Sequence, residues 1–129
     1  MTPVALVSIV EDDESMRMAT ASAIRSMGWE VLTFESAAAF LDSGAVGQTR
    51  CLISDVTMPG MSGIEMHACL LANGYAPPTI FLTGYPTARD EAVVLANGAL
   101  AYLTKPTDFN IVARNVKFAL DKARSPRAD

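Results

Sequence analysis

The sequence predicts an α/β fold: a doubly wound, five-stranded parallel sheet with five helices packed on its two faces. Short runs rich in β-branched and aliphatic residues alternate with longer stretches of helical periodicity. The chain has 129 residues, about the usual size of one domain. Half of the residues are hydrophobic and 19% are charged, a balance that supports a packed core. These observations together favour βα units that close a parallel sheet.

The strands are expected at five short apolar runs, which are residues 5–10, 30–34, 51–54, 79–82 and 101–103. The first, third and fourth runs are nearly continuous in apolar residues, as strands are when helices cover both faces of a sheet. We therefore expect these three at the centre. Five βα units with right-handed crossovers favour the flavodoxin-like strand order 2-1-3-4-5.

The helices are expected at residues 14–27, 37–41, 63–72, 88–97 and 109–123. Ser36 and Thr87 stand where a hydroxyl can cap the second and fourth of them. Gly28, Gly74 and Gly98 each follow a helix at a position that needs a left-handed backbone. The apolar residues of the last helix form one stripe that should pack on the sheet: Phe109, Ile111, Val112, Val116, Ala119, Leu120 and Ala123.

Composition excludes several classes of function. The net charge of −4 gives no electrostatic footprint for DNA or RNA, so we expect no direct contact with nucleic acid. Cys51 and Cys69 match no disulfide framework or metal-ligand spacing and are interpreted as reduced thiols. No basic leader and no apolar run of membrane-spanning length is present, which favours a cytoplasmic protein without membrane contact. His67, the only histidine, is expected at the surface of a helix.

Polar residues follow four of the predicted strands. Glu11 and Asp12 follow the first strand, Asp55 the third, Thr83 the fourth and Lys105 the fifth. Because the carboxyl ends of parallel strands share one edge of a sheet, we expect these side chains in one pocket. Three carboxylates repel one another, and Mg²⁺ or Mn²⁺ would offset that repulsion together with Lys105. Such a pocket predicts that Asp55 acts as a nucleophile toward a phosphoryl group.

Four motifs carry a family resemblance. They are residues 10–13 (VEDD), 55–63 (DVTMPGMSG), 82–84 (LTG) and 102–106 (YLTKP). In this order the chain resembles a response-regulator receiver domain of the CheY-like fold over residues 4–123, and residues 55–63 resemble FixJ-type and NtrC-type receivers. The resemblance implies bacterial two-component signalling, in which a histidine kinase or phosphotransfer protein phosphorylates Asp55 and the modified domain controls a partner or effector.

The resemblance also implies the ligands of the metal ion. Asp12 and Asp55 would ligate Mg²⁺, Glu11 would act mainly through a metal-bound water, and the backbone carbonyl of Thr57 would be the third protein ligand. Glu11 stands where aspartate is commoner. We expect its longer arm to preserve metal binding and to shift the bridging water.

Further roles follow from the same resemblance. Thr83 would bond to the phosphoryl oxygen, Lys105 would pair with that oxygen, and Tyr102 matches the aromatic switch residue. The peptide bond before Pro106 is expected to be cis. The face formed by the fourth helix, the fifth strand and the fifth helix would change on activation. Thr57 and Tyr85 match positions that tune access of hydrolytic water.

Residues 1–124 are expected to form the receiver and residues 125–129 a tail or the start of a linker. A stand-alone receiver, which we slightly favour, and a fragment of a larger regulator both fit the sequence, and a homodimer stays open. The sequence names no kinase, stimulus or output target, and gives no phosphoryl lifetime.

Two functions of other classes were weighed. A flavin mononucleotide carrier needs a loop rich in Ser, Thr and Gly after the first strand, whereas residues 11–14 are all acidic. A phosphohydrolase similar to haloacid dehalogenases would have Asp-x-Asp at the end of that strand. The sequence therefore favours self-phosphotransfer with slow autodephosphorylation over a multiple-turnover enzyme.

Overall fold

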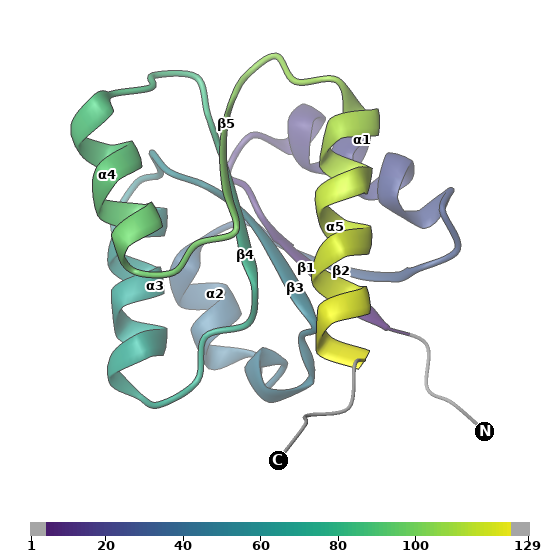
Figure 1. Ribbon diagram of the computed structural model, residues 1–129, viewed down its shortest axis with the longest axis horizontal. Coiled ribbons are helices and arrows are strands. Elements are labelled where there is room, and N and C mark those ends of the chain that lie inside the picture. The colour runs from purple at the N-terminus through teal and green to yellow at the C-terminus, as the bar shows by residue number, and fades with distance from the viewer. Residues whose placement is uncertain (1–4, 125–129) are drawn as a thin grey trace.

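A five-stranded parallel sheet forms the centre of the molecule (Figure 1). The computed structural model describes residues 5–124; residues 1–4 and the predicted tail at 125–129 lie outside the described residues. The strands are β1 (Leu6–Val10), β2 (Glu30–Phe34), β3 (Cys51–Asp55), β4 (Thr79–Thr83) and β5 (Ala101–Thr104). Their order is β2-β1-β3-β4-β5 and every pair is parallel, so the predicted topology is confirmed.

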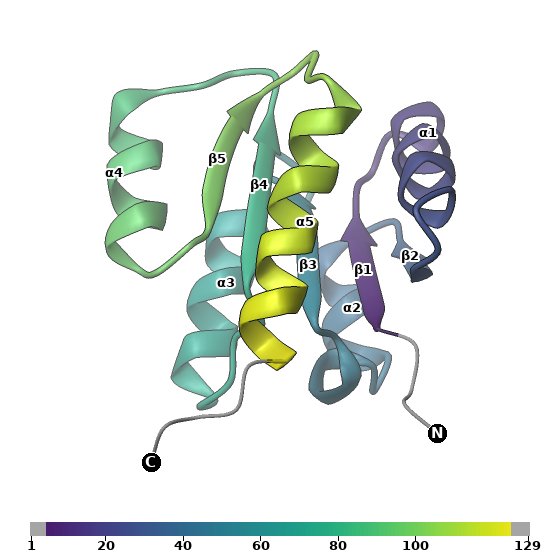
Figure 2. The same cartoon turned by 45° about the vertical axis from the view of Figure 1, so that its right-hand side comes forward.

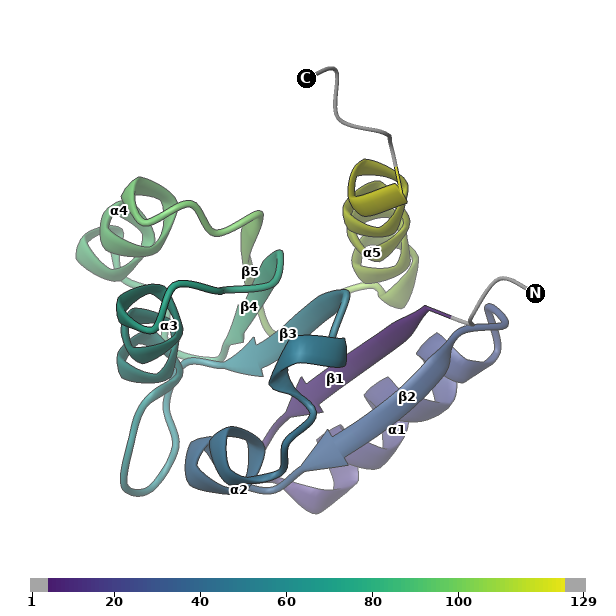
Figure 3. The ribbon, with the colours of Figure 1, turned by 90° about the horizontal axis from the view of Figure 1, so that it is seen from below.

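Helices cover both faces of this sheet. They are α1 (Glu14–Arg25), α2 (Ala37–Asp42), α3 (Gly63–Ala72), α4 (Ala88–Ala96) and α5 (Phe109–Arg124). α1 and α5 pack on one face of the sheet, and α2, α3 and α4 pack on the other. Seen from below, α3 and α4 lie together at the left, apart from α5 (Figure 3). The predicted bounds of these elements differ from the observed ones by at most two residues. A short 3-10 helix, η1 (Val46–Gln48), was missed because three residues carry no periodic signal.

The ends of the helices have the predicted chemistry. Ser36 accepts a hydrogen bond from the backbone of Ala39, and Thr87 accepts one from the backbone of Asp90. The glycines after α1, α3 and α4 have positive φ angles of 91°, 89° and 92°, where a side chain would be strained. These caps fix where each helix stops and hence where the next strand enters the sheet.

The core lies on both faces of the three central strands. All residues of β1, β3 and β4 are buried, which confirms their predicted central place. Alternate side chains point to opposite faces, so each strand serves two hydrophobic clusters. The cluster under α1 and α5 includes Val7, Ile9, Ile53, Ile80, Val112 and Val116. Burial of each such side chain contributes about 1.5–3 kcal/mol.

The outer helix α5 corrects one sequence prediction. Val112, Val116, Ala119 and Leu120 face the core as predicted, but Ile111 is 40% exposed. Ile111 precedes Val112 by one residue, a turn of about 100° on a helix, which carries it beyond the core-facing stripe. The side chain of Ala123, also assigned to that stripe, lies outside the described residues.

The two cysteines lie at different depths in the fold. Cys51 is buried, Cys69 is partly buried, and both are free thiols. Burial raises the pKa of Cys51 to about 12, so this thiol stays protonated. Among residues 5–124, no helix combines the length and the apolar character that crossing a bilayer requires.

His67 is buried, which contradicts its predicted place at the surface. It is 3% exposed, and its ring meets Phe81 of β4 edge-on, with centroids 5.5 Å apart and planes at 88°. The prediction was wrong because α3 turns Met66, His67 and Leu70 toward the sheet together, and one histidine among apolar residues does not reveal this orientation. Burial lowers the pKa of His67 below its usual value.

Replacing His67 with Phe should weaken the loss of stability on acidification. Because burial lowers the folded-state pKa, the unfolded chain binds the proton more readily than the folded chain. The stability that neutral His67 contributes is complete above the unfolded pKa of about 6.5 and is lost as the pH falls through the folded pKa. Between about pH 7.5 and pH 5.5, Tm should therefore fall further for wild type than for His67→Phe. Equal falls in Tm would contradict the role assigned to burial.

Candidate functional site

The carboxyl ends of the strands meet at one edge of the sheet. The arrowheads of β1, β4 and β5 point to the same upper edge in Figure 2. Glu11 and Asp12 directly follow β1 and Asp55 ends β3, its neighbour in the sheet. One carboxylate oxygen from each of these three residues lies within 4.8 Å of the other two. The structure thus brings together side chains that are 43 and 44 residues apart in the chain.

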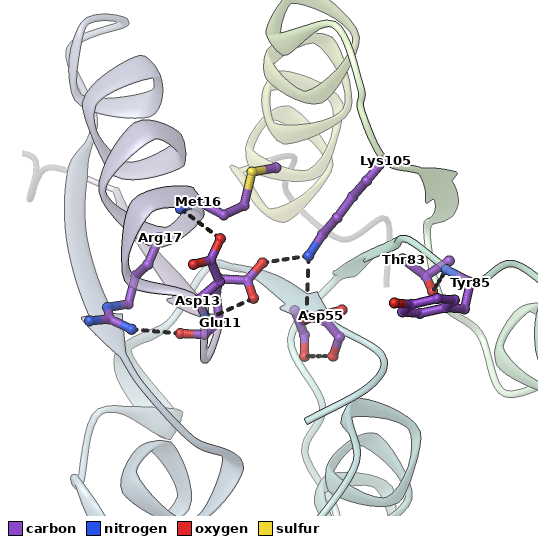
Figure 4. Close-up of polar contacts among 9 residues, drawn as sticks. Glu11, Asp13, Met16, Arg17, Asp55, Thr83, Tyr85 and Lys105 are labelled. Carbon is purple, nitrogen blue, oxygen red and sulfur yellow. Dashed lines mark hydrogen bonds and ion pairs between the residues drawn. The ribbon is translucent and has the colours of Figure 1, made fainter. Parts of the chain in front are cut away.

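Lys105 extends from the end of β5 into this cluster (Figure 4). Its Nζ lies 2.7 Å from Oε1 of Glu11 and 3.3 Å from Oδ2 of Asp55. The Lys105 backbone N–H donates to the carbonyl of Thr83, and the bond to Pro106 is cis, as expected. The sequence placed Lys105 beside the three carboxylates without indicating which of them it pairs with. The nearer partner is Glu11, because both Glu11 and Lys105 have long side chains that meet between the strand ends.

Burial and charge shift the pKa values of this pair. Glu11 is 4% exposed, and burial raises its pKa to about 7. The hydrogen bond from Lys105 acts in the lowering direction, while Asp55 raises the pKa further. Burial alone would lower the pKa of Lys105, but Glu11 and Asp55 outweigh that effect and raise it. Lys105 therefore stays cationic beside the carboxylates.

The turn after β1 holds Glu11 through its backbone and its side chain. The Glu11 N–H donates to the carbonyl of Phe34 at 3.0 Å, and Arg17 Nη1 donates to the Glu11 carbonyl at 2.9 Å. The Asp13 N–H donates to Oε2 of Glu11 at 3.2 Å. Asp13 itself caps α1 by accepting from the Met16 N–H. Arg17 was missed, because its contact with a backbone carbonyl leaves no motif.

A tight crossing of two chain segments holds Asp55. Ser54 Oγ donates to the carbonyl oxygen of Asp55 at 2.8 Å, and the Gly63 N–H donates to the carbonyl of Val56 at 2.9 Å. A side-chain carbon at position 63 would collide with the Asp55 carbonyl oxygen and crowd Ser54 Oγ. The sequence motif that contains Gly63 does not reveal that this glycine permits the close approach behind Asp55.

Thr83 and Tyr102 both contact the connection between β4 and α4. Thr83 is fully buried, and its hydroxyl oxygen accepts a hydrogen bond from the Tyr85 N–H at 3.0 Å. The Tyr102 hydroxyl accepts one from the N–H of Thr87, the residue that caps α4, at 3.1 Å. The ring of Tyr102 is partly buried against a small cluster that contains Val56, Phe81, Val94 and Ala99. Both residues thus touch the same connection from different strands.

The donor set at the carboxyl edge suits a hard divalent cation. Glu11, Asp12 and Asp55 offer carboxylate oxygens, the ligands that Mg²⁺ and Mn²⁺ prefer. In an octahedral site with metal–oxygen distances of about 2.1 Å, ligand oxygens lie about 3.0 Å or about 4.2 Å apart, and the three oxygens here lie within 4.8 Å of one another. Thr57, predicted to add a backbone carbonyl, lies exposed in the loop after β3, two residues beyond Asp55. The residues present therefore fit such an ion.

Comparison with known proteins gives concordant matches. A family model described as the response regulator receiver domain matches residues 7–117. Nodulation protein W of Bradyrhizobium diazoefficiens is 38% identical over 102 residues, which cover 79% of this chain and 45% of that protein. The transcriptional regulatory protein FixJ of Azorhizobium caulinodans is 33% identical over 117 residues, covering 91% and 56%. The chain thus spans about half the length of these curated relatives.

A solved structure supports the same match at the level of the fold. The crystal structure of FixJ-N superposes with a TM-score of 0.83 at 26% identity. The superposition covers 98% of this chain and 100% of that one. The strand order and the position of the helices are therefore shared along nearly the whole chain.

Replacing Gly63 with Ala should destabilise the protein and displace Asp55. The added methyl group collides with backbone, which cannot move aside as a flexible side chain could. Overpacking of this kind costs about 1–3 kcal/mol. Urea denaturation of Gly63→Ala measures the cost. Gly47→Ala is the matched control, since a side-chain carbon at position 47 meets nothing within 4 Å, and unchanged stability in both variants would refute the crossing as a constraint.

Proposed function

Because this chain belongs to the response regulator receiver family, we propose that it works in two-component signalling by accepting a phosphoryl group on Asp55. The family consists of signalling domains and not of classical enzymes. The observation that supports Asp55 as the acceptor is the convergence of three carboxylates and Lys105 at one sheet edge. The donor we propose is the phosphohistidine of a kinase or phosphotransfer protein, with which the domain would meet in the cytoplasm.

Asp55 is favoured as acceptor over its two acidic neighbours. Both carboxylate oxygens of Glu11 already accept hydrogen bonds, one from Lys105 and one from the Asp13 N–H, so Glu11 is less free than Asp55 to approach a donor. Asp12 is exposed and lies on the turn that leads into α1. Asp55 ends a central strand, is 8% exposed and faces the Lys105 ammonium. Asp55 thus lies in a buried position beside the positive charge of Lys105, and a phosphoryl group requires such a charge.

The proposed transfer involves only the Asp55 carboxylate and the phosphohistidine donor as reactants. A carboxylate oxygen of Asp55 attacks phosphorus, an acyl phosphate bond forms, the bond from phosphorus to the donor nitrogen breaks, and the imidazole retains that electron pair. Lys105 offsets the charge on the phosphoryl oxygens. A divalent cation held by Glu11, Asp12, Asp55 and the Thr57 carbonyl would supply further positive charge there.

The proposed output passes through Thr83 and Tyr102. The Thr83 hydroxyl oxygen accepts a hydrogen bond from the Tyr85 N–H, and we expect the side chain to move relative to Tyr85 when its O–H donates to the phosphoryl oxygen. That change alters the β4–α4 connection, where the Tyr102 hydroxyl holds the Thr87 N–H. We expect the face of α4, β5 and α5 to change and to bind the output partner. That partner is a separate protein, a second copy of this chain or a further domain of the same chain.

Incubation with acetyl phosphate and Mg²⁺ tests the acceptor. Intact-mass measurement should show the gain of one phosphoryl group in wild type and no gain in Asp55→Asn, because the amide is a poor nucleophile. Asp13→Asn is the matched control: Asp13 caps α1, so labelling should persist. Equal labelling of wild type and Asp55→Asn would overturn the assignment.

Thermal unfolding with increasing Mg²⁺ tests the cation site. An ion that binds only the folded chain raises stability by about 2.7 kcal/mol at about 100 times its Kd. We expect Tm to rise with Mg²⁺ in wild type and in Asp42→Asn, which removes an exposed carboxylate at the end of α2. The rise should be largely lost in Asp12→Asn. An equal rise in all three proteins would place the ion elsewhere.

A further inference from the structure

The two charged groups nearest to Asp55 are joined to each other more closely than to Asp55. The contact from Lys105 Nζ to Glu11 is 2.7 Å, whereas the contact to Asp55 is 3.3 Å. The other carboxylate oxygen of Glu11 accepts from the Asp13 N–H. In this arrangement Glu11 is the principal partner of the lysine that, under the proposed function, must serve the phosphoryl group.

Glu11 cannot serve Lys105 and a divalent cation equally well. If Oε1 of Glu11 received the ammonium and also faced the ion, two positive charges would lie next to each other and repel. Conversely, a cation that draws Glu11 away removes the shorter of the two contacts of Lys105. The remaining contact points toward Asp55, where the phosphoryl group is added.

We propose that Glu11 is a positioning residue with two alternative partners, the Lys105 ammonium and the divalent cation, and that it releases Lys105 toward the phosphoryl group on Asp55 when it turns to the cation. This inference rests on the proposed function and adds a second role for the cation. The ion neutralises the carboxylates and also makes Lys105 available. Phosphoryl acceptance then depends on the cation through Lys105 as well as through direct charge.

The contact with Lys105 depends on the length of the glutamate side chain at position 11. Its carboxylate extends one carbon–carbon bond, about 1.5 Å, further than that of aspartate. The backbone of residue 11 is held on both sides, by the Phe34 carbonyl at 3.0 Å and by Arg17 at 2.9 Å, so it does not move to compensate. With aspartate, and with Lys105 in its present position, the contact of 2.7 Å would lengthen by up to about 1.5 Å, beyond ion-pair distance. The shorter side chain would keep a carboxylate for the cation and lose the grip on Lys105.

A double-mutant cycle on Mg²⁺ affinity tests this competition. Calorimetric titration would give Kd for wild type, Lys105→Met, Glu11→Asp and the double variant. Lys105→Met frees Glu11 and should tighten binding by about tenfold in the wild-type background, a coupling of ordinary size. In the Glu11→Asp background, Lys105→Met should tighten Mg²⁺ binding by only about twofold. This variant still removes one positive charge near the ion, but residue 11 no longer binds Lys105 and so no longer has two competing partners. Thermal unfolding of the four proteins checks that each is folded.

The outcomes separate this inference from the proposed function. An equal change of Kd in both backgrounds would refute the competition for Glu11, whether or not Asp55 is phosphorylated. Labelling by acetyl phosphate, followed on wild type and Glu11→Asp by intact mass, reports on the function itself. Labelled Asp55 together with an equal change of Kd would remove only the role of Glu11. Absent labelling in wild type would remove the function.

Discussion

Three carboxylates and one ammonium group meet at the carboxyl edge of the sheet, and the balance of their charges governs what the site can hold. The strand order makes this meeting unavoidable, because β1 and β3 are neighbours and both end in acidic residues. Repulsion among the carboxylates would otherwise expel Glu11 toward solvent or favour its protonation. Lys105, delivered by β5 across the edge, provides the charge that keeps the cluster compact.

Hydrogen bonds and close packing hold the backbone around the cluster in place. Ser54 and Gly63 fix the peptide behind Asp55, and Arg17 fixes the carbonyl of Glu11. None of these groups presents a charge directly to the acceptor carboxylate. Their effect is geometric, since an error of about 1 Å in a reacting group costs roughly a hundredfold in rate. Under the proposed function, phosphoryl transfer to Asp55 therefore depends on Arg17 and Ser54, which lie outside the four motifs, as well as on Gly63.

The sequence predicted the features that depend on local pattern. Continuous apolar runs identified the central strands, and polar residues at four strand ends identified the site, because a parallel sheet aligns those ends. It could not predict that Glu11 and Lys105 pair, since the two residues are 94 positions apart in the chain and the contact depends on how far their side chains extend. Ile111 was misplaced because it lies at the border of the core-facing stripe of α5, where a small rotation decides between core and solvent. His67 was misplaced because its polar ring suggested solvent, although it lies within the core-facing stripe of α3.

Asp55, Thr83 and Tyr102 lie on three successive strands of the sheet, β3, β4 and β5. Thr83 lies one strand away from Asp55, and Thr83 and Tyr102 each hold an N–H of the same β4–α4 connection. A modification at Asp55 can shift the conformation only by the difference in its interaction with two arrangements of that connection. Thr83 is buried and Tyr102 only partly so, and under the proposed function the inner residue would respond to the modified Asp55 while the outer one would face the partner. The two hydrogen bonds to one loop would couple them.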